Sequence, residues 1–195
     1  MGRRSDVNLT TNAKLRYSAG AMIFHWTIAV LVIWNWRLAE NAEHAETREQ
    51  AMAIFADHKA IGITILALTL GRIAWRLTHR MPALPATYAK WEWMLARGTH
   101  IVFYVLLVAL PLGGWYANSL AGREVDMFGL FTIPPLPVGD NPDLAGSIFD
   151  LHGTGAMAMI YLVGLHILGA LKHTFVDRDG GIFRMLPFGR VDSPR

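Results

Sequence analysis

Four long apolar runs, separated by short charged stretches, dominate the pattern of the chain. They cover about residues 18–38, 52–77, 95–118 and 147–175, and each can cross the roughly 30 Å hydrocarbon core of a bilayer as a helix. The pattern predicts an all-α integral membrane protein, a bundle of four transmembrane helices, in which residues 1–195 form one membrane domain. No small-residue cleavage site follows the first run, so we expect it to remain as a span rather than be removed as a signal peptide.

Lysines and arginines are distributed unequally between the two sides of the predicted bundle. Fourteen of the eighteen lie in the N-terminal segment, around the turn between the second and third spans, and in the C-terminal tail. Because basic residues accumulate in cytoplasmic segments, both termini are predicted to be cytoplasmic. The other four lie on the opposite, outer side: Arg37, Arg48, Lys59 and Arg123. They are outnumbered there by ten acidic residues: Glu40, Glu43, Glu46, Glu49, Asp57, Glu124, Asp126, Asp140, Asp143 and Asp150.

The composition narrows the chemistry that the chain can carry. Charged residues make up 17% of it, below the roughly 25% of typical soluble chains. The absence of cysteine excludes disulfides, cysteine-ligated iron–sulfur clusters and covalent haem attachment. The formal net charge of +3 does not indicate a nucleic-acid partner, because the basic residues flank apolar segments.

Histidine remains as the main candidate metal ligand, and an ionisable residue inside a span usually has a function. In the fourth span His152 and His166 are 14 residues apart, so they share one helix face at a separation of about 21 Å. His58 matches His152 in depth on the outer side, and His25 matches His166 on the inner side. Pairs at two depths predict two b-type haems, each ligated by two histidines. Zinc would instead need three or four ligands at one point.

Two further histidines, His100 and His173, lie at the predicted inner edge. Spacing leaves open that either of them ligates a haem in place of His25. We favour a ubiquinone site, because a histidine can hydrogen-bond a quinone carbonyl and move protons. Arg72 is assigned to a haem propionate, since arginine pairs with carboxylates through two hydrogen bonds. Arg76 fits a propionate or a lipid phosphate equally well.

The motifs that carry these histidines resemble the bacterial cytochrome b561 family, whose best-defined function is that of superoxide oxidase. The similarity covers roughly residues 15 to 188. It rests on Phe24-His25-Trp26, Asp57-His58-Lys59-Ala60-Ile61-Gly62, Gly98-Thr99-His100, Ala109-Leu110-Pro111-Leu112-Gly113-Gly114, Leu151-His152-Gly153, Gly164-Leu165-His166 and the following His173. The resemblance implies two b haems, the outer held by His58 and His152 and the inner by His25 and His166. It also implies a ubiquinone site near His100 and His173.

The resulting hypothesis is an oxidoreductase of the bacterial inner membrane, embedded in lipid with several spans. Superoxide or another one-electron donor would be oxidised on the periplasmic side, and ubiquinone would be reduced near the cytoplasmic side. Two features depart from the family pattern: an acidic outer face, which repels superoxide, and Leu151 where a tryptophan is common. Lys59 and Arg123 can still form a local positive entrance.

The alternative hypothesis is an electron-transfer subunit that links the quinone pool to a periplasmic redox protein. The acidic outer face suits a basic protein partner. A transporter with gating histidines would not account for the paired depths. His44 and His79 lie in polar loops and are expected to be solvated.

Overall fold

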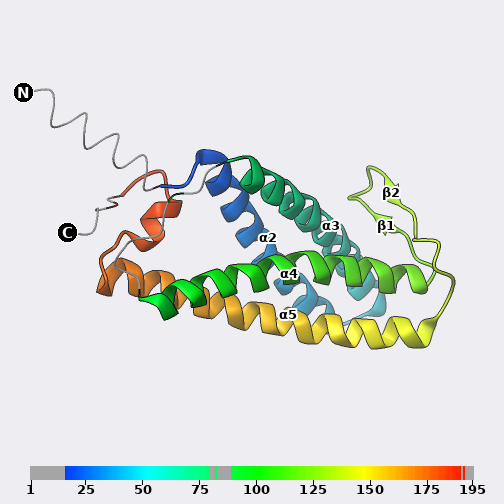
Figure 1. The fold of residues 1–195 in the computed structure, drawn as a ribbon. Helices are drawn as coiled ribbons and strands as arrows, with labels where there is room; N and C mark the ends of the chain where they lie inside the picture. The colour runs from blue at the N-terminus through cyan, green and yellow to red at the C-terminus, as the bar shows by residue number, and fades with distance from the viewer. Residues whose placement is uncertain (1–15, 80–81, 83–88, 190, 192–195) are drawn as a thin grey trace, which may run out of the picture.

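The computed structural model describes residues 16–79, 82, 89–189 and 191, and its main feature is a bundle of four long helices (Figure 1). The helices are α2 (Ala19–Glu43), α3 (Arg48–Thr78), α4 (Lys90–Leu120) and α5 (Pro142–Leu171). All four are long and apolar enough to cross a membrane. The predicted four-span, all-α architecture is therefore confirmed.

The helices extend beyond the predicted spans because side-chain caps, rather than the ends of the apolar runs, determine where they begin. Thr47 accepts a hydrogen bond from the N–H of Gln50 at the start of α3, so the outer loop expected over 39–51 shortens to residues 44–47. Asn141 caps α5 in the same way, and Pro142 fits the first turn, where no N–H is needed. Helix α5 thus begins at Pro142, five residues before the predicted start of the fourth span at 147.

A layer of apolar side chains in the middle of the bundle joins all four helices. In lipid such a layer is held mainly by van der Waals packing, because removal from water contributes little. Met159 lies midway along α5 between His152 and His166, so the layer separates two levels of histidines. The buried members are Ile28, Ile61, Ile65, Leu107 and Met159.

The loop between α4 and α5 contains a small hairpin that the sequence analysis did not predict. Strand β1 (Val125–Asp126) pairs antiparallel with β2 (Thr132–Ile133). Val125 is buried against Ala60 of α3, and Ile63 packs beside them. The proline-rich loop therefore folds back along the bundle.

Asn118 and Ser119 at the end of α4 hold this loop in place through hydrogen bonds. The Asn118 side-chain amide donates to the carbonyls of Arg123 and Glu124 at 2.7 and 3.3 Å. The Ser119 hydroxyl accepts the N–H of Leu136 at 3.0 Å. These bonds satisfy backbone groups that would otherwise be exposed to an apolar environment.

The segment after α5 returns to the beginning of α2. It passes through a π-helical turn, η1 (Lys172–Val176), and a 3-10 turn, η2 (Gly181–Met185). The Tyr17 N–H donates to the Arg184 carbonyl at 3.1 Å, and the Trp26 indole donates to the Met185 carbonyl at 2.7 Å. Both ends of the described chain thus lie together, opposite the hairpin (Figure 1). That this end is cytoplasmic stays a prediction.

Candidate functional site

His58 of α3 and His152 of α5 form a pair near the end of the bundle that carries the hairpin. Their ring centroids are 6.1 Å apart. Nδ1 of His58 donates to the Asn35 carbonyl at 3.0 Å, and Nδ1 of His152 donates to the Leu110 carbonyl at 3.0 Å. A carbonyl only accepts, so each neutral ring carries its proton on Nδ1 and presents an unprotonated Nε2. Both rings are therefore fixed in the tautomer that a metal ligand needs.

A second cluster lies towards the opposite end of the bundle. His25 and His166 have ring centroids 6.3 Å apart, and His100 and His166 have ring centroids 5.7 Å apart. Phe103 also packs against His166, with ring centroids 5.3 Å apart. The structure thus brings three histidines together at this level, from α2, α4 and α5.

Arg72 gives the inner cluster a different hydrogen-bond arrangement from the outer pair. Its guanidinium donates to Nδ1 of His25 at 3.1 Å. Since arginine has no acceptor, Nδ1 of His25 must accept, and the proton of the neutral ring lies on Nε2. Arg72 and Arg76 also lie over the Tyr104 ring, at 5.8 and 5.5 Å from its centroid.

Both pair separations match two imidazoles that ligate one metal ion from opposite sides. Metal–imidazole bonds of about 2.0 Å, with ring nitrogens about 1.1 Å from the ring centre, give centroids about 6.2 Å apart. The observed values are 6.1 Å for the outer pair and 6.3 Å for His25 with His166. His100 and His166, at 5.7 Å, are closer than this spacing. The outer level offers two nitrogen donors, which fit haem iron and are too few for zinc; at the inner level His25 and His166 have the spacing of two ligands of one iron, and His100 does not.

Two buried indole N–H groups belong to residues that are next in sequence to neighbours of the outer histidines. Trp36 follows Asn35 in α2, and Trp115 follows Gly114 in α4. Neither Nε1 has a hydrogen-bond partner among the atoms that the structure describes. Buried indoles usually find an acceptor, so these donors suit a ligand with anionic oxygens.

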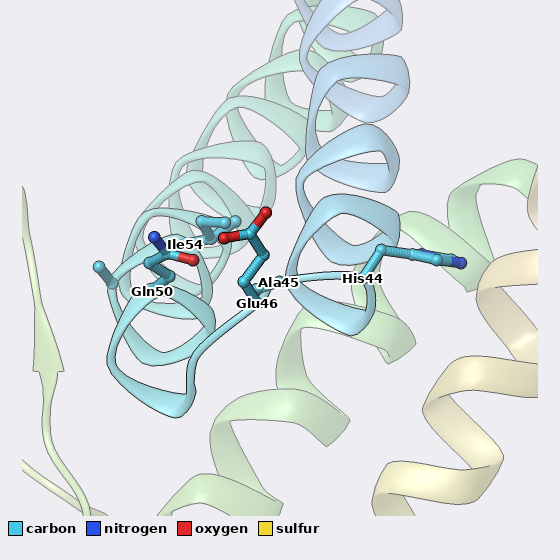
Figure 2. A pocket seen from close by; sticks show the side chains of 6 residues that line it. His44, Ala45, Glu46, Gln50 and Ile54 are labelled. Atoms are coloured by element: carbon cyan, nitrogen blue, oxygen red, sulfur yellow. The ribbon is translucent and has the colours of Figure 1, made fainter.

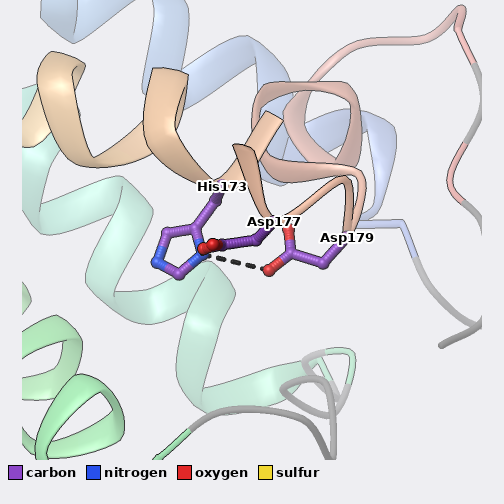
Figure 3. A group of neighbouring side chains, drawn as sticks. All are labelled: His173, Asp177 and Asp179. Atoms are coloured by element: carbon purple, nitrogen blue, oxygen red, sulfur yellow. Dashed lines mark hydrogen bonds and ion pairs between the residues drawn. The ribbon is translucent and has the colours of Figure 1, made fainter. Parts of the chain in front are cut away.

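His173 lies in η1 between two carboxylates (Figure 3). Its Nδ1 is 2.8 Å from Oδ2 of Asp177 and 3.0 Å from Oδ2 of Asp179. Carboxylates accept, so this nitrogen carries a proton. The other ring nitrogen faces away from both carboxylates (Figure 3). Asp179 is itself buried, and its Oδ1 accepts the Gly181 N–H at 3.1 Å.

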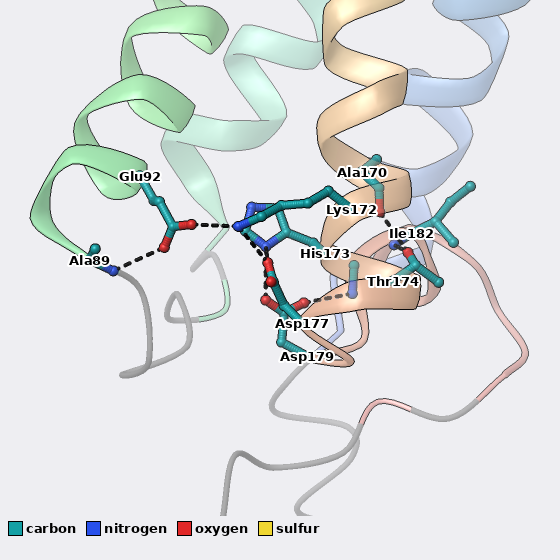
Figure 4. A network of polar contacts seen from close by, with 10 residues as sticks. Ala89, Glu92, Ala170, Lys172, His173, Thr174, Asp177, Asp179 and Ile182 are labelled. Atoms are coloured by element: carbon teal, nitrogen blue, oxygen red, sulfur yellow. Dashed lines mark hydrogen bonds and ion pairs between the residues drawn. The ribbon is translucent and has the colours of Figure 1, made fainter.

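A wider polar network ties this turn to the start of α4 (Figure 4). Lys172 Nζ lies 2.6 Å from Glu92 Oε1 and 2.9 Å from Asp177 Oδ2. The donor atoms of His173, Asp177 and Asp179 are close enough together to ligate a cation. Lys172 already supplies a positive charge there, so we assign the cluster to hydrogen bonding.

The outer end carries both a positive and an acidic region. Lys59 follows His58 and donates to Asn118 Oδ1 at 3.4 Å, with Arg123 near enough to interact electrostatically. A separate hollow of about 530 Å³ lies between the end of α2 and the start of α3. His44, Glu46 and Gln50 are among the residues that line it (Figure 2).

The sequence analysis missed the groups that orient the histidines. The Asn35 and Leu110 carbonyls leave no signal in a sequence, because every residue has one. Asp177 could have been found, since it lies four residues after His173 on a helical turn. Of the two loop histidines, His44 bonds the Glu40 carbonyl and His79 stacks on Trp75.

The chain is similar to known proteins over most of its length. A family model described as prokaryotic cytochrome b561 matches residues 16–188. Cytochrome b561 homolog 2 of Escherichia coli (strain K12) is 29% identical over 182 residues, covering 90% of this chain and 94% of the relative. The probable superoxide oxidase CybB of Yersinia pestis is 32% identical over 172 residues, covering 88% and 96%. Cytochrome b562 of Cereibacter sphaeroides is 27% identical over 175 residues, covering 87% and 94%.

Two adjacent glycines in α4 provide a matched test of the outer pair. A Cβ on Gly114 would lie 3.2 Å from Cε1 of His152, whereas one on Gly113 would meet only Ile148, at 4.0 Å. Gly114→Ala should displace the His152 ring, weaken its bond to Leu110 and shift the absorption and midpoint potential of one haem. Gly113→Ala should change neither.

Redox-titrated visible spectra of the purified variants make this measurement. Both substitutions favour the helix by about 0.5–1 kcal/mol, so backbone effects cancel between them. Equal spectral shifts in the two variants, or none in Gly114→Ala, would contradict the position of His152 beside a haem.

Proposed function

Because the chain belongs to the prokaryotic cytochrome b561 family, whose members bind b haem and transfer electrons in the bacterial inner membrane, we propose that it holds two b haems. We further propose that electrons pass from superoxide on the periplasmic side to ubiquinone near the cytoplasmic side. Two superoxide ions would each lose one electron to become O₂. One ubiquinone would take up two electrons and two protons to become ubiquinol.

The observation that carries the proposal is the pairing of histidines at two levels with near-equal ring separations, 6.1 and 6.3 Å. His58 and His152 are the proposed ligands of the outer haem, and His25 and His166 those of the inner haem. Bound haem supplies reversible one-electron chemistry. The apolar layer around Met159 keeps water from the space between the levels.

Arg72 is proposed to hold a propionate of the inner haem. For Nε2 of His25 to ligate iron, its proton must lie on Nδ1, so Arg72 must give up its present bond to that atom. A carboxylate is a stronger acceptor for a guanidinium than an imidazole nitrogen. A propionate would thus both occupy Arg72 and release His25.

Superoxide as donor is supported by the local charge at Lys59. Lys59 follows His58 in α3, and Arg123 adds a second positive charge near it, against one carboxylate, Asp126. A local positive entrance attracts an anion even where the wider face is acidic. The similarity to the relative named probable superoxide oxidase also favours this donor.

Ubiquinone is proposed to bind near His100 and His173. His100 packs on His166, which would keep a bound quinone close to the inner haem. His173 is held by Asp177 and Asp179, whose carboxylates accept a hydrogen bond from Nδ1 and fix the orientation of the ring. When the ring nitrogen that faces away from them carries a proton, it can donate that proton to a quinone oxygen.

The second candidate function is an electron-transfer subunit with a basic periplasmic partner. The observation that favours it is the hollow beside Glu46 and Gln50, on the acidic connection between α2 and α3. Acidic patches steer basic proteins to a surface and repel superoxide.

Stopped-flow mixing with superoxide, with quinone present, distinguishes the two functions. We expect haem reduction in the wild type and its loss in His58→Ala, which removes the outer ligand. Lys59→Gln should slow the bimolecular step by up to about tenfold, because it removes charge at the entrance. Arg48→Gln is the matched control, since it removes an outer charge at the start of α3, and should have little effect.

Wild-type reduction no faster than in His58→Ala would exclude superoxide as donor and favour the protein partner. Equal slowing by Lys59→Gln and Arg48→Gln would show that the whole face, and no local entrance, steers the anion.

Asp179→Asn tests the proposed proton donor. An asparagine that keeps the Gly181 bond through its oxygen presents its NH₂ to His173 and removes one of the two carboxylate acceptors of Nδ1, so that only Asp177 remains. Quinone reduction should fall by up to roughly a hundredfold, the low end of general acid–base contributions, while haem spectra stay unchanged. Glu92→Gln is the control, because it breaks the bond to Lys172 without touching His173. Similar quinone kinetics in both variants would remove His173 from the proton path.

A further inference from the structure

The hairpin between α4 and α5 presents an apolar tip that the proposed redox function does not use. Residues 127–138 include no charged side chain, although they belong to the connection at the outer end. At the tip, Phe128, Leu130 and Phe131 are 51%, 81% and 59% exposed. Soluble surfaces rarely expose apolar residues in such a contiguous group.

The backbone of the tip is strained in a way that favours display of a large ring. Phe128 has φ +58° and Gly129 has φ +72°, and the Leu130 N–H closes the turn on the Met127 carbonyl at 3.1 Å. Positive φ at both central residues is typical of a type I′ turn, where asparagine, aspartate or glycine is preferred at the first of them. A phenylalanine there is unfavourable for the backbone, so its retention points to a role for the side chain.

The hairpin lies at the depth where α3 leaves the apolar part of the bundle. Lys59 is the last charged residue before the uncharged stretch 60–71, and Val125 of the hairpin packs on Ala60. At the same level the bond from His58 to the Asn35 carbonyl aligns α2 with α3. Trp34, next to Asn35, is largely exposed there, as expected of an aromatic residue at a membrane interface.

Figure 1 shows the hairpin beside α3, projecting away from α4 and α5. Its tip is therefore a lateral extension of the bundle and does not cover the end. An extension at interface depth faces lipid headgroups and the upper acyl chains.

The tip also satisfies its own backbone groups, which a segment that leaves water requires. The Met127 N–H donates to the Phe131 carbonyl at 2.8 Å. The Gly129 N–H donates to the Asp126 carboxylate, at 3.0 and 3.2 Å from its two oxygens. Together with the Leu130 bond, three N–H groups of the turn are paired internally.

We propose that this hairpin is a membrane anchor: Phe128, Leu130 and Phe131 insert into the headgroup region of the leaflet at the outer end of the bundle. Glu124 and Asp126 flank the tip, so the anchor needs no anionic lipid and works in a neutral bilayer. A second copy of the chain is a less suitable partner for this apolar tip than the lipid is. Three partly exposed side chains offer about 400 Å², below the roughly 800 Å² per partner of a stable interface.

The absence of cysteine makes a direct depth measurement practical. The full-length haem-containing protein would carry one spin label at Leu130→Cys, in nanodiscs of phosphatidylcholine. The label collides more often with apolar oxygen when it lies in the bilayer, and more often with a water-soluble nickel chelate when it lies in water. The ratio of the two collision rates therefore reports its depth. Glu46→Cys, on the outer loop, is the water reference. Leu70→Cys, an exposed position within the uncharged stretch 60–71 of α3, is the lipid reference.

The label at Leu130→Cys should show an oxygen-to-nickel collision ratio several-fold above that at Glu46→Cys and below that at Leu70→Cys. A ratio equal to that at Glu46→Cys would place the tip in water and overturn the proposal. A label shielded from both reagents would mean that protein covers the tip, which would overturn it too.

Phe128→Asn combined with Phe131→Ser tests the rings themselves. Asparagine suits the left-handed turn, so the hairpin should still fold, and unchanged haem spectra would verify the bundle. The collision ratio at Leu130→Cys should fall towards the water reference. A ratio that stays at its original value would show that the rings do not anchor the hairpin.

Discussion

Polar imidazole rings inside an apolar bundle are the constraint on which the arrangement depends. Each neutral ring has one donor and one acceptor, and neither can be satisfied by lipid. The outer rings use Nδ1 to bond the carbonyls of Asn35 and Leu110, and this leaves Nε2 of each neutral ring unprotonated. The separation of the two rings, 6.1 Å, is the distance that one metal ion between them would require.

The two levels differ, and the difference has functional meaning. The outer pair is held by backbone carbonyls, which cannot move without the helices, so it is ready to bind a metal. At the inner level Arg72 occupies Nδ1 of His25, and His100 lies beside His166. A flexible, charged side chain and an additional histidine make the inner level adjustable. That suits a site where a haem, a quinone and protons would meet.

Much of the fold could be predicted from the sequence because lipid imposes a length and an apolar composition on every span. The four helices and the depth pairing of His58 with His152 follow from those rules. The hairpin could not be predicted in this way. Its residues are uncharged like those of the spans, but the run is too short to cross the bilayer. The contacts of His173 with Asp177 and Asp179 depend on the π-helical turn, which no sequence pattern indicated. The family match confirms a multi-pass protein of the bacterial inner membrane.

Low-temperature electron paramagnetic resonance of the oxidised protein, combined with the haem-to-protein ratio, tests the central claim most directly. If the two histidine pairs each ligate one haem, the protein will contain two haems per chain, and both irons will be low-spin with nitrogen on each side. A high-spin ferric signal, or a single haem per chain, would contradict the assignment of His25, His58, His152 and His166 as the ligand set.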